Sequence, residues 1–325
     1  LYARGDGFLT NIQTGDKNVG RFDDWTIRTG IKAQITPDVS LLVRYTHSHV
    51  DDPNPALVNS YTGPDFAAGY PFFAVPGQYT FNPREVANGT KPGEKLFIRT
   101  NADVVQGTLK ADLGFANLTS YTQYRKEKVD SLISLDYSGV EAFGLGLPND
   151  NKTFTQEVLL SSKAGSKLQW TAGMFYMSNR DTYITTIGYS GNNVLSPPLR
   201  LGGSSTTTVN LSAFLDATYE IMPKLFITAG VRYSHDKVGD AYWNTRFLAP
   251  TYTDANNVVH QAPGGVVPVP DISSNHATPR VVLRFKPDDQ SSIYASFARG
   301  YKTGGWTTRL SNPLPYAPSF NPEKA

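Results

Sequence analysis

Long strand-like segments of this sequence are joined alternately by short turns and by long polar connections. Five short turns lie at residues 36–38, 112–114, 163–166, 222–224 and 287–290, and the long connections span 50–95, 130–151, 187–205 and 239–274. A soluble sandwich or propeller has no reason to keep its short turns at one end. The up-and-down strands of an outer-membrane β-barrel do so, with short periplasmic turns and long extracellular loops. The connection lengths therefore favour an all-β, transmembrane antiparallel β-barrel.

Segment 207–221 shows the clearest two-residue period. One face carries Val209, Leu211, Ala213, Leu215, Ala217, Tyr219 and Ile221, and the other carries Asn210, Ser212, Phe214, Asp216, Thr218 and Glu220. Segment 225–233 continues the apolar face after the short turn. Such alternation predicts strands with one apolar and one polar face. Both segments reach the roughly 9–11 residues that a tilted strand needs to cross a membrane.

The same pattern predicts about eleven strands, at 2–10, 22–36, 39–50, 96–112, 115–129, 152–162, 167–186, 206–221, 224–238, 276–286 and 291–302. The faces of 96–112 and 115–129 are the least clearly defined. A soluble sheet with one apolar face needs a second apolar layer to cover it. Neither a helical segment nor a second sheet pattern supplies that layer.

Several predicted strands carry charged residues opposite their apolar residues. These residues are Arg28, Lys32, Asp216, Glu220, Arg232, Arg280 and Arg284. Charges are costly in a dry protein core unless they are paired. We therefore expect these side chains to face a water-filled lumen.

The amino-acid composition further narrows the class of protein to which the chain can belong. Charged residues make up 18% and hydrophobic residues 39% of the chain, which is typical neither of disorder nor of a helical membrane protein. No run approaches the about 18 apolar residues of a membrane helix. The net charge of +2 gives no reason to expect a nucleic-acid partner, and the absence of Cys excludes disulfides and thiolate metal sites.

Three groups of segments resemble barrel strands of TonB-dependent outer-membrane receptors. The strongest match is SIYASFARGYKTGGW at 292–306, followed by FNPE at 320–323. The second is AFLDATY at 213–219 with LFITAGVRYSHD at 225–236, and the third is FTQEVLLSS at 154–162 with WTAGMFY at 170–176. The opening DGFLTN at 6–11 resembles an early barrel strand of the same family.

The resemblance implies a larger parent protein. Family barrels have about 22 strands around a plugged lumen. Residues 1–325 correspond to a partial barrel of about eleven strands, with short periplasmic turns and long extracellular loops. We expect an internal fragment that lacks the plug domain and the C-terminal strands, because the chain starts within a predicted strand and ends in a polar segment.

The resemblance also implies a function, in the bacterial outer membrane. We expect a receptor, not an enzyme, that takes up a scarce nutrient by energy-coupled transport, with an iron–siderophore complex as the first choice of ligand. Its implied partners are outer-membrane lipid, the small-molecule ligand and an inner-membrane energy-coupling protein that acts through the plug. No nucleic-acid partner is expected.

Two alternatives of other classes stay open. A passive porin-like barrel would differ from an active receptor by having no plug. A soluble β-rich binding module such as a propeller predicts a repeat of about 40–50 residues with similar turns at both sheet ends, and neither is found. An outer-membrane enzyme is disfavoured because no nucleophile–base signature is present.

The sequence predicts no cofactor and no catalytic or metal residues. His47 and His49 share a strand face and could chelate together, but two His at a loop edge without a third ligand fit solvated side chains better. His235 and Asp236, at another strand end, are a weaker pair.

The long loop 51–94, within the connection 50–95, is the candidate ligand-contact loop. It is rich in Pro, Gly and aromatic residues, including Tyr70, Phe72, Phe73 and Tyr79. Loops of this length are uncommon unless they are functional or disordered. Exposed aromatic rings could stack on a siderophore, a sugar or an aromatic nutrient, or they could pack the loop against its neighbours.

Overall fold

In the computed structural model, residues 1–12, 15–52, 84–86, 96–134, 143–190, 193–245, 251–253, 259–261, 265–306 and 319–324 are described. All regular structure among them is β-structure. None of them forms a helix with the length and apolar character needed to cross a membrane. The predicted all-β class is confirmed.

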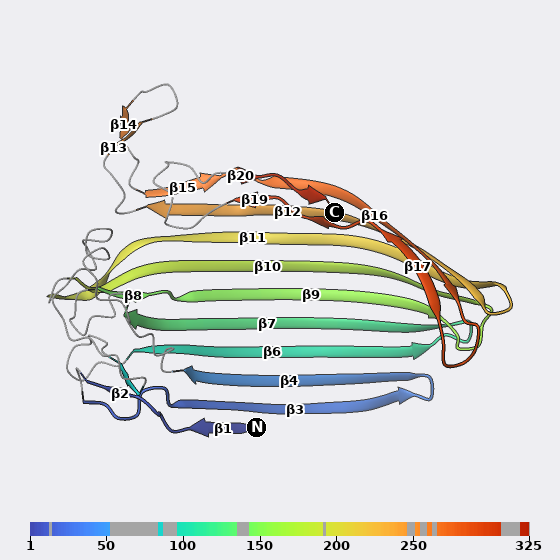
Figure 1. Cartoon of the computed structure of the whole chain (residues 1–325), viewed down its shortest axis with the longest axis horizontal. Helices are drawn as coiled ribbons and strands as arrows, with labels where there is room; N and C mark the ends of the chain where they lie inside the picture. Colours follow the sequence, from blue (N-terminus) through green and yellow to red (C-terminus); the bar gives the residue numbers. More distant parts are fainter. Residues whose placement is uncertain are drawn as a thin grey trace.

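Thirteen strands form one antiparallel sheet (Figure 1). They are β1 (Tyr2–Gly5), β3 (Phe22–Thr36), β4 (Val39–Asp52), β6 (Phe97–Asp112), β7 (Ala116–Ser134), β8 (Phe143–Gly146), β9 (Asn149–Ser162), β10 (Leu168–Ser190), β11 (Asn193–Met222), β12 (Leu225–Thr245), β15 (Gly265–Val269), β16 (Ile272–Phe285) and β17 (Ile293–Ala298). Apart from the short strands β8 and β15, neighbours along the chain are neighbours in the sheet. This is the up-and-down order that the short turns predicted.

Four small pairs of strands lie outside this sheet. They are β2 (Thr10–Asn11) with β5 (Glu85–Val86), β13 (Thr251–Thr253) with β14 (Val259–Gln261), β18 (Tyr301–Lys302) with β21 (Glu323–Lys324), and β19 (Gly305–Trp306) with β20 (Ser319–Phe320). Only the first of these four pairs is parallel. The long strands thus form the wall, and the small pairs belong to the connections.

All five predicted short turns join neighbouring long strands at one end of the sheet (Figure 1). Three of them contain a residue in the left-handed region: Gly114 at φ 81°, Gly165 at φ 82° and Lys224 at φ 69°. Glycine reaches this region without the steric cost that other residues meet. Lys224 is held there by two contacts, from its amide to Glu220 Oε1 at 2.8 Å and from Nζ to Pro287 O at 2.6 Å.

The two faces of the sheet differ in polarity and in crowding. On the apolar face Leu211 and Tyr233 are 48% and 55% exposed. On the polar face Ser212 and Ser234, in the same two strands, are 3% and 1% exposed. Side chains on the concave face of a curved sheet converge and cover one another, whereas those on the convex face spread apart. The exposures therefore identify the polar face as the concave one.

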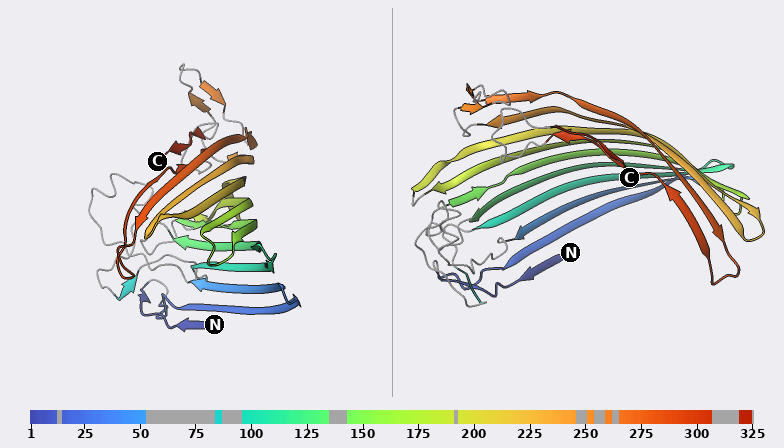
Figure 2. Two further views of the ribbon diagram at one scale, coloured as in Figure 1. Left: turned by 90° about the vertical axis from the view of Figure 1, so that its right-hand side faces the viewer. Right: turned by 45° about the horizontal axis from the view of Figure 1, so that its top comes forward.

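The sheet is curved and does not close on itself (Figure 2). Its strand order runs from β1 to β17, and these two terminal strands do not pair with each other. Beyond its four pairs with β1, which involve residues 22–25, and the backbone hydrogen bonds between Thr26 and Leu1, β3 has no partner on that side among the described residues. The described part is therefore an open arc of barrel-like wall.

The predicted connection 187–205 is almost entirely strand. Residues 187–205 were expected to be a long loop, but β10 continues to Ser190 and β11 begins at Asn193. The ladder has irregularities where Ile187 pairs with Leu199 and Tyr189 with Val194. Pro197, Pro198 and the glycines that follow argue locally for a loop, and pairing along two long strands overrides that preference.

The two terminal strand predictions need correction. Segment 2–10 is not one strand, because β1 ends at Gly5 and Leu9 forms only an isolated bridge with Val19. Segment 291–302 leaves the main ladder after Ala298, and Tyr301 and Lys302 pair with β21 instead of β16. The alternation pattern alone carries no information about which neighbour a strand will find.

Candidate functional site

The polar face of the sheet is the candidate site, because it gathers charged and hydrogen-bonding side chains from many strands. All seven charges expected to face a lumen lie on this face by strand register: Arg28, Lys32, Asp216, Glu220, Arg232, Arg280 and Arg284. Residues directly opposite each other on paired strands share a face. Arg28 and Lys32 lie on β3, which five strands separate from β11, so the structure does not bring them to the other five charged residues.

Two of the seven form an ion pair across β12. Arg280 Nη2 lies 2.6 Å from Asp216 Oδ2, although their strands, β16 and β11, are not adjacent. The residue between them is Gly230, which faces both. A Cβ at Gly230 would lie 2.3 Å from Asp216 Oδ2. The glycine therefore leaves the space through which the two charges meet.

Arg232 is the centre of a second group. Its Nη2 donates a hydrogen bond to Ser212 Oγ at 2.5 Å, and its guanidinium carbon lies 5.5 Å from the ring centroids of both Phe175 and Phe214. Cation–aromatic contacts at this range are attractive. The two rings restrict the arginine while its remaining N–H groups can donate to another acceptor. Such a group suits recognition of an anionic or oxygen-rich molecule.

Asp236 is a buried carboxylate next to this group. It is 6% exposed, and its oxygens accept hydrogen bonds from Asn210 Nδ2 at 2.6 Å and from the Tyr301 hydroxyl at 2.5 Å. Tyr301 also stacks on His276, with ring centroids 4.0 Å apart. The chain after β17 thus crosses the polar face and covers part of it. The carboxylate is satisfied by hydrogen bonds, as burial requires.

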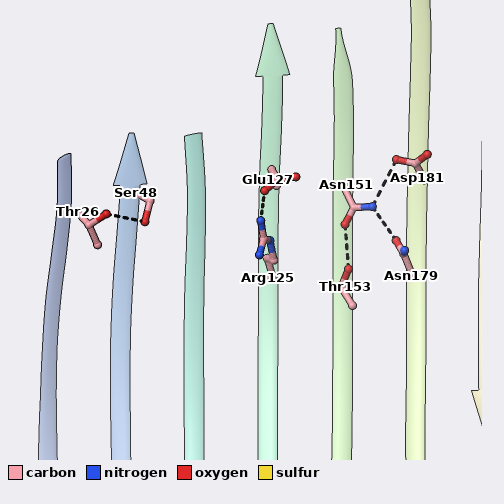
Figure 3. Close-up of polar contacts among 8 residues, drawn as sticks. All are labelled: Thr26, Ser48, Arg125, Glu127, Asn151, Thr153, Asn179 and Asp181. Atoms are coloured by element: carbon pink, nitrogen blue, oxygen red, sulfur yellow. Dashed lines mark hydrogen bonds and ion pairs between the residues drawn. The ribbon is translucent and has the colours of Figure 1, made fainter. Parts of the chain in front are cut away.

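A third group lies nearer the end of the sheet that carries the long connections (Figure 3). Asn151 Nδ2 donates to Asn179 Oδ1 at 3.0 Å and to Asp181 Oδ1 at 3.4 Å. Thr153 donates to Asn151 Oδ1 at 2.9 Å, and Arg125 pairs with Glu127 on the neighbouring strand β7. Figure 3 also shows the Thr26–Ser48 contact on β3 and β4, at 3.1 Å. Donors and acceptors therefore extend across the face from β3 to β10.

The two candidate histidine pairs behave differently from a chelating site. His47 and His49 do share a face, but each has its own partner, with Nδ1 atoms 2.8 Å from Asp103 Oδ1 and 2.7 Å from Asn101 Oδ1. His235 and Asp236 are consecutive in β12 and point to opposite faces. Among the described residues, no group of three or more His, Asp or Glu side chains is placed to hold a metal ion.

The aromatic loop residues Tyr70, Phe72, Phe73 and Tyr79 lie outside the described residues. Their contact with a ligand stays a prediction. Sequence reasoning did not single out Asn151, Asn179, Asp181, Asn210 or Tyr301 as site residues. Alternation places Asn179, Asp181 and Asn210 on the polar face, and that is the signal that could have selected them. Asn151 lies in the predicted connection 130–151, just before the predicted strand 152–162. No local signal marks Tyr301, because its contacts depend on where the chain leaves the ladder.

Comparison with known proteins gives a family and a fold. The family model described as TonB dependent receptor-like, beta-barrel, matches residues 44–325. No curated protein matches the sequence significantly.

Solved structures with a similar fold include the ferric yersiniabactin uptake receptor FyuA from Yersinia pestis, with a TM-score of 0.73 and 15% identity over 99% of this chain and 44% of that one. BauA, the ferric preacinetobactin receptor from Acinetobacter baumannii, has a TM-score of 0.61 and 15% identity over 99% of this chain and 45% of that one. The ferric citrate transporter FecA has a TM-score of 0.59 and 11% identity over 92% of this chain and 38% of that one. The chain spans less than half the length of these structures.

Proposed function

The chain belongs to the family of TonB-dependent receptor-like β-barrels, and we propose that it is part of the barrel wall of a bacterial outer-membrane receptor that takes up iron–siderophore complexes by energy-coupled transport. In this proposal the apolar face contacts outer-membrane lipid. The polar face lines the lumen through which the ligand passes. The rest of the barrel and a plug are supplied by parts of the protein beyond these residues.

The contrast between the two faces carries the proposal. Large apolar side chains stay exposed along the whole convex face, including Ile31, Met174, Leu215 and Phe297 at 51–76%. A soluble protein rarely exposes so extensive an apolar surface. The long strands of the sheet have 14 to 30 residues, more than enough to cross a bilayer when tilted. An apolar exterior with a polar interior is the pattern of a transmembrane barrel.

The chemistry of the polar face supports an oxygen-rich, charged ligand. Arg232, Arg280 and Arg284 offer cationic donors, while Asn151, Asn179 and Asp181 offer amide and carboxylate groups at the long-connection end. Ferric siderophores present many oxygen atoms, and many of them carry a net charge. FyuA, BauA and FecA are receptors or transporters of ferric ligands, which supports the same choice. The aromatic loop residues Tyr70, Phe72, Phe73 and Tyr79 are proposed as a first contact for that ligand.

The proposal includes two protein-level partners. A plug inside the barrel would block free diffusion through the lumen. An inner-membrane energy-coupling protein would act on that plug, so that uptake depends on the proton-motive force. No catalytic step is part of the proposal, and the family is one of receptors and transporters.

The test is uptake by cells that carry the intact receptor as their sole barrel of this family. Cells are given radioactive iron bound to a panel of siderophores, with and without a protonophore. We expect accumulation of at least one complex above the external concentration, and its loss when the proton-motive force collapses. Equilibration that is insensitive to the protonophore would favour the passive barrel, and transport of a nutrient without iron would overturn the choice of ligand.

A further inference from the structure

Three cations lie side by side on the apolar face of the sheet. Lys126 on β7 is directly opposite Lys152 on β9, and Lys152 is directly opposite Arg180 on β10. All three side chains are exposed. We call these three residues the basic row. Like charges directly opposite each other on adjacent strands destabilise a sheet.

The surroundings do not neutralise the row. Asp103 on β6 is opposite Lys126, but its carboxylate already contacts His47 and the Tyr45 hydroxyl, at 2.8 and 2.6 Å. Within the described part of the chain, neither Lys152 nor Arg180 has an ion pair or a side-chain hydrogen bond. Lys128 and Asp150 are opposite each other on the same face, two residues nearer the long connections. Together with this pair and Asp103, the row sets four positive charges against two carboxylates.

An aromatic row follows immediately on the short-turn side. Two residues from the basic row, the same face carries Tyr45, Tyr124 and Phe154 on β4, β7 and β9. Tyr176 on β10 joins them, with its ring centroid 6.1 Å from that of Phe154. Aromatic girdles mark the boundary between the hydrocarbon and the headgroups in transmembrane barrels.

The height of the basic row agrees with this boundary. Lys126 is ten residues from Ala116, the first residue of β7 at the short-turn end. Ten residues at about 3.3 Å each cover about 33 Å along the strand. With a strand tilt of about 40°, this corresponds to about 25 Å across the membrane, which is about the height of the apolar band. The basic row therefore lies at headgroup level in the leaflet nearer the long connections.

We propose that the basic row and the aromatic row together form a docking site for a phosphate-bearing lipid of that leaflet. The phosphate lies among Lys126, Lys152 and Arg180, and the acyl chains pass over Tyr124, Phe154 and Tyr176. Charge complementarity selects the occupant, because a phosphate relieves the repulsion among the three cations and offers several acceptor oxygens at once. The inference rests on the proposed function, because that function places the apolar face against the membrane.

The test titrates the intact receptor in neutral detergent micelles with bisphosphorylated lipid A, and bound lipid is counted by native mass spectrometry. Each removed cation is expected to weaken binding about fivefold. The Lys126→Gln, Lys152→Gln double variant should therefore bind about 25-fold more weakly than the wild type. Lys237→Gln is the matched control, because Lys237 is a cation of the same face that is already paired with Asp271 at 2.6 Å.

Two further binding measurements identify the source of the phosphate. Lipid A without phosphate groups should bind to the wild type more weakly than the phosphorylated form binds to the double variant, because the double variant still has Arg180. Inorganic phosphate should not displace the lipid, because it lacks the contacts to the aromatic row. Equal binding by both receptors, or full displacement by inorganic phosphate, would overturn the proposal. So would the capture of a protein at the row in place of the lipid.

Failure of this inference can be told from failure of the proposed function. Siderophore uptake and the resistance of the folded barrel to SDS are measured on the same variants. Normal uptake and folding without lipid A binding would reject the docking site alone. A wild-type protein that is not embedded in the membrane at all would reject the proposed function.

Discussion

At the residue scale, Gly107 in β6 and Gly114 in the turn after it allow the cost of backbone strain to be measured apart from the cost of packing. Gly107 and Gly114 both have open space where a Cβ would be added, but only Gly114 has a positive φ, of 81°. An alanine in the left-handed region costs about 1–2 kcal/mol. We expect Gly114→Ala to lower the free energy of unfolding by that amount in urea titrations of the refolded barrel. Gly107→Ala is the control, and equal effects of the two variants would contradict the explanation.

Asp288 makes the stability of the 287–290 turn depend on pH. A hydrogen bond from the Gln290 amide, at 2.9 Å, and further hydrogen bonds from Ser291 lower the pKa of the Asp288 carboxyl. A lowered folded-state pKa means that this stabilisation is complete above the unfolded value of about 3.9 and is lost as the pH falls through the folded value.

The corresponding experiment compares the wild type with Asp288→Ala by urea unfolding. The stability difference between them should be largest near about pH 6 and should narrow below about pH 4. Asp289→Ala is the neighbouring control. A difference that stays constant, or grows, as the pH falls would show that the carboxylate does not hold the turn.

At the scale of the element, the seam between β10 and β11 depends on one glycine. Gly173 is directly opposite Phe214, and a Cβ added there would lie 2.4 Å from Phe214 Cζ and 2.8 Å from Leu159 Cδ2. The ring therefore lies over the glycine, an arrangement that fills the space left by the missing side chain. The same ring contributes to the surroundings of Arg232.

A double-mutant cycle tests this seam. Gly173→Ala should cost about 1–3 kcal/mol of unfolding free energy, because the added methyl group overpacks the site. Phe214→Ala should remove most of that conflict, so the double variant should cost less than the sum of the single variants. Simple additivity would mean that the ring and the glycine do not interact.

The long β10–β11 hairpin shows how an element can escape sequence analysis. Alternation and turn position predicted β3 at its exact bounds, 22–36, and β4, β6 and β16 to within a few residues. For 187–205, Pro and Gly argued for a loop, yet the two strands pair to Ser190 and Asn193. Pairing with neighbouring strands decides the structure of such stretches, and a local sequence window does not contain those strands.

At the scale of the whole molecule, the described sheet has two terminal strands that do not pair with each other, β1 and β17. An open sheet edge presents unpaired backbone groups, which no bilayer core can satisfy and which invite pairing with other chains. We expect residues 1–325 on their own to associate into oligomers or aggregates in detergent instead of inserting as a closed barrel. Size-exclusion chromatography with light scattering measures this, and a folded, monodisperse monomer would contradict it.

The sequence by itself determined the class of fold, the positions of the short turns and the face on which each strand residue lies. These properties are local, since a two-residue period and a turn signal are contained within a few neighbouring positions. The seven charges from Arg28 to Arg284 could therefore be assigned to one face without a structure. Only the tertiary structure decided which of them meet.

Strand register is the physical reason for this division. Register joins residues that are far apart in the chain, such as Asp216 with Arg280 and Asp236 with Tyr301. It also aligns Lys126, Lys152 and Arg180 into one row. A shift of one residue in any strand would leave each local pattern intact and would send that strand's side chains to the other face. Contacts that depend on such alignment are properties of the assembled sheet.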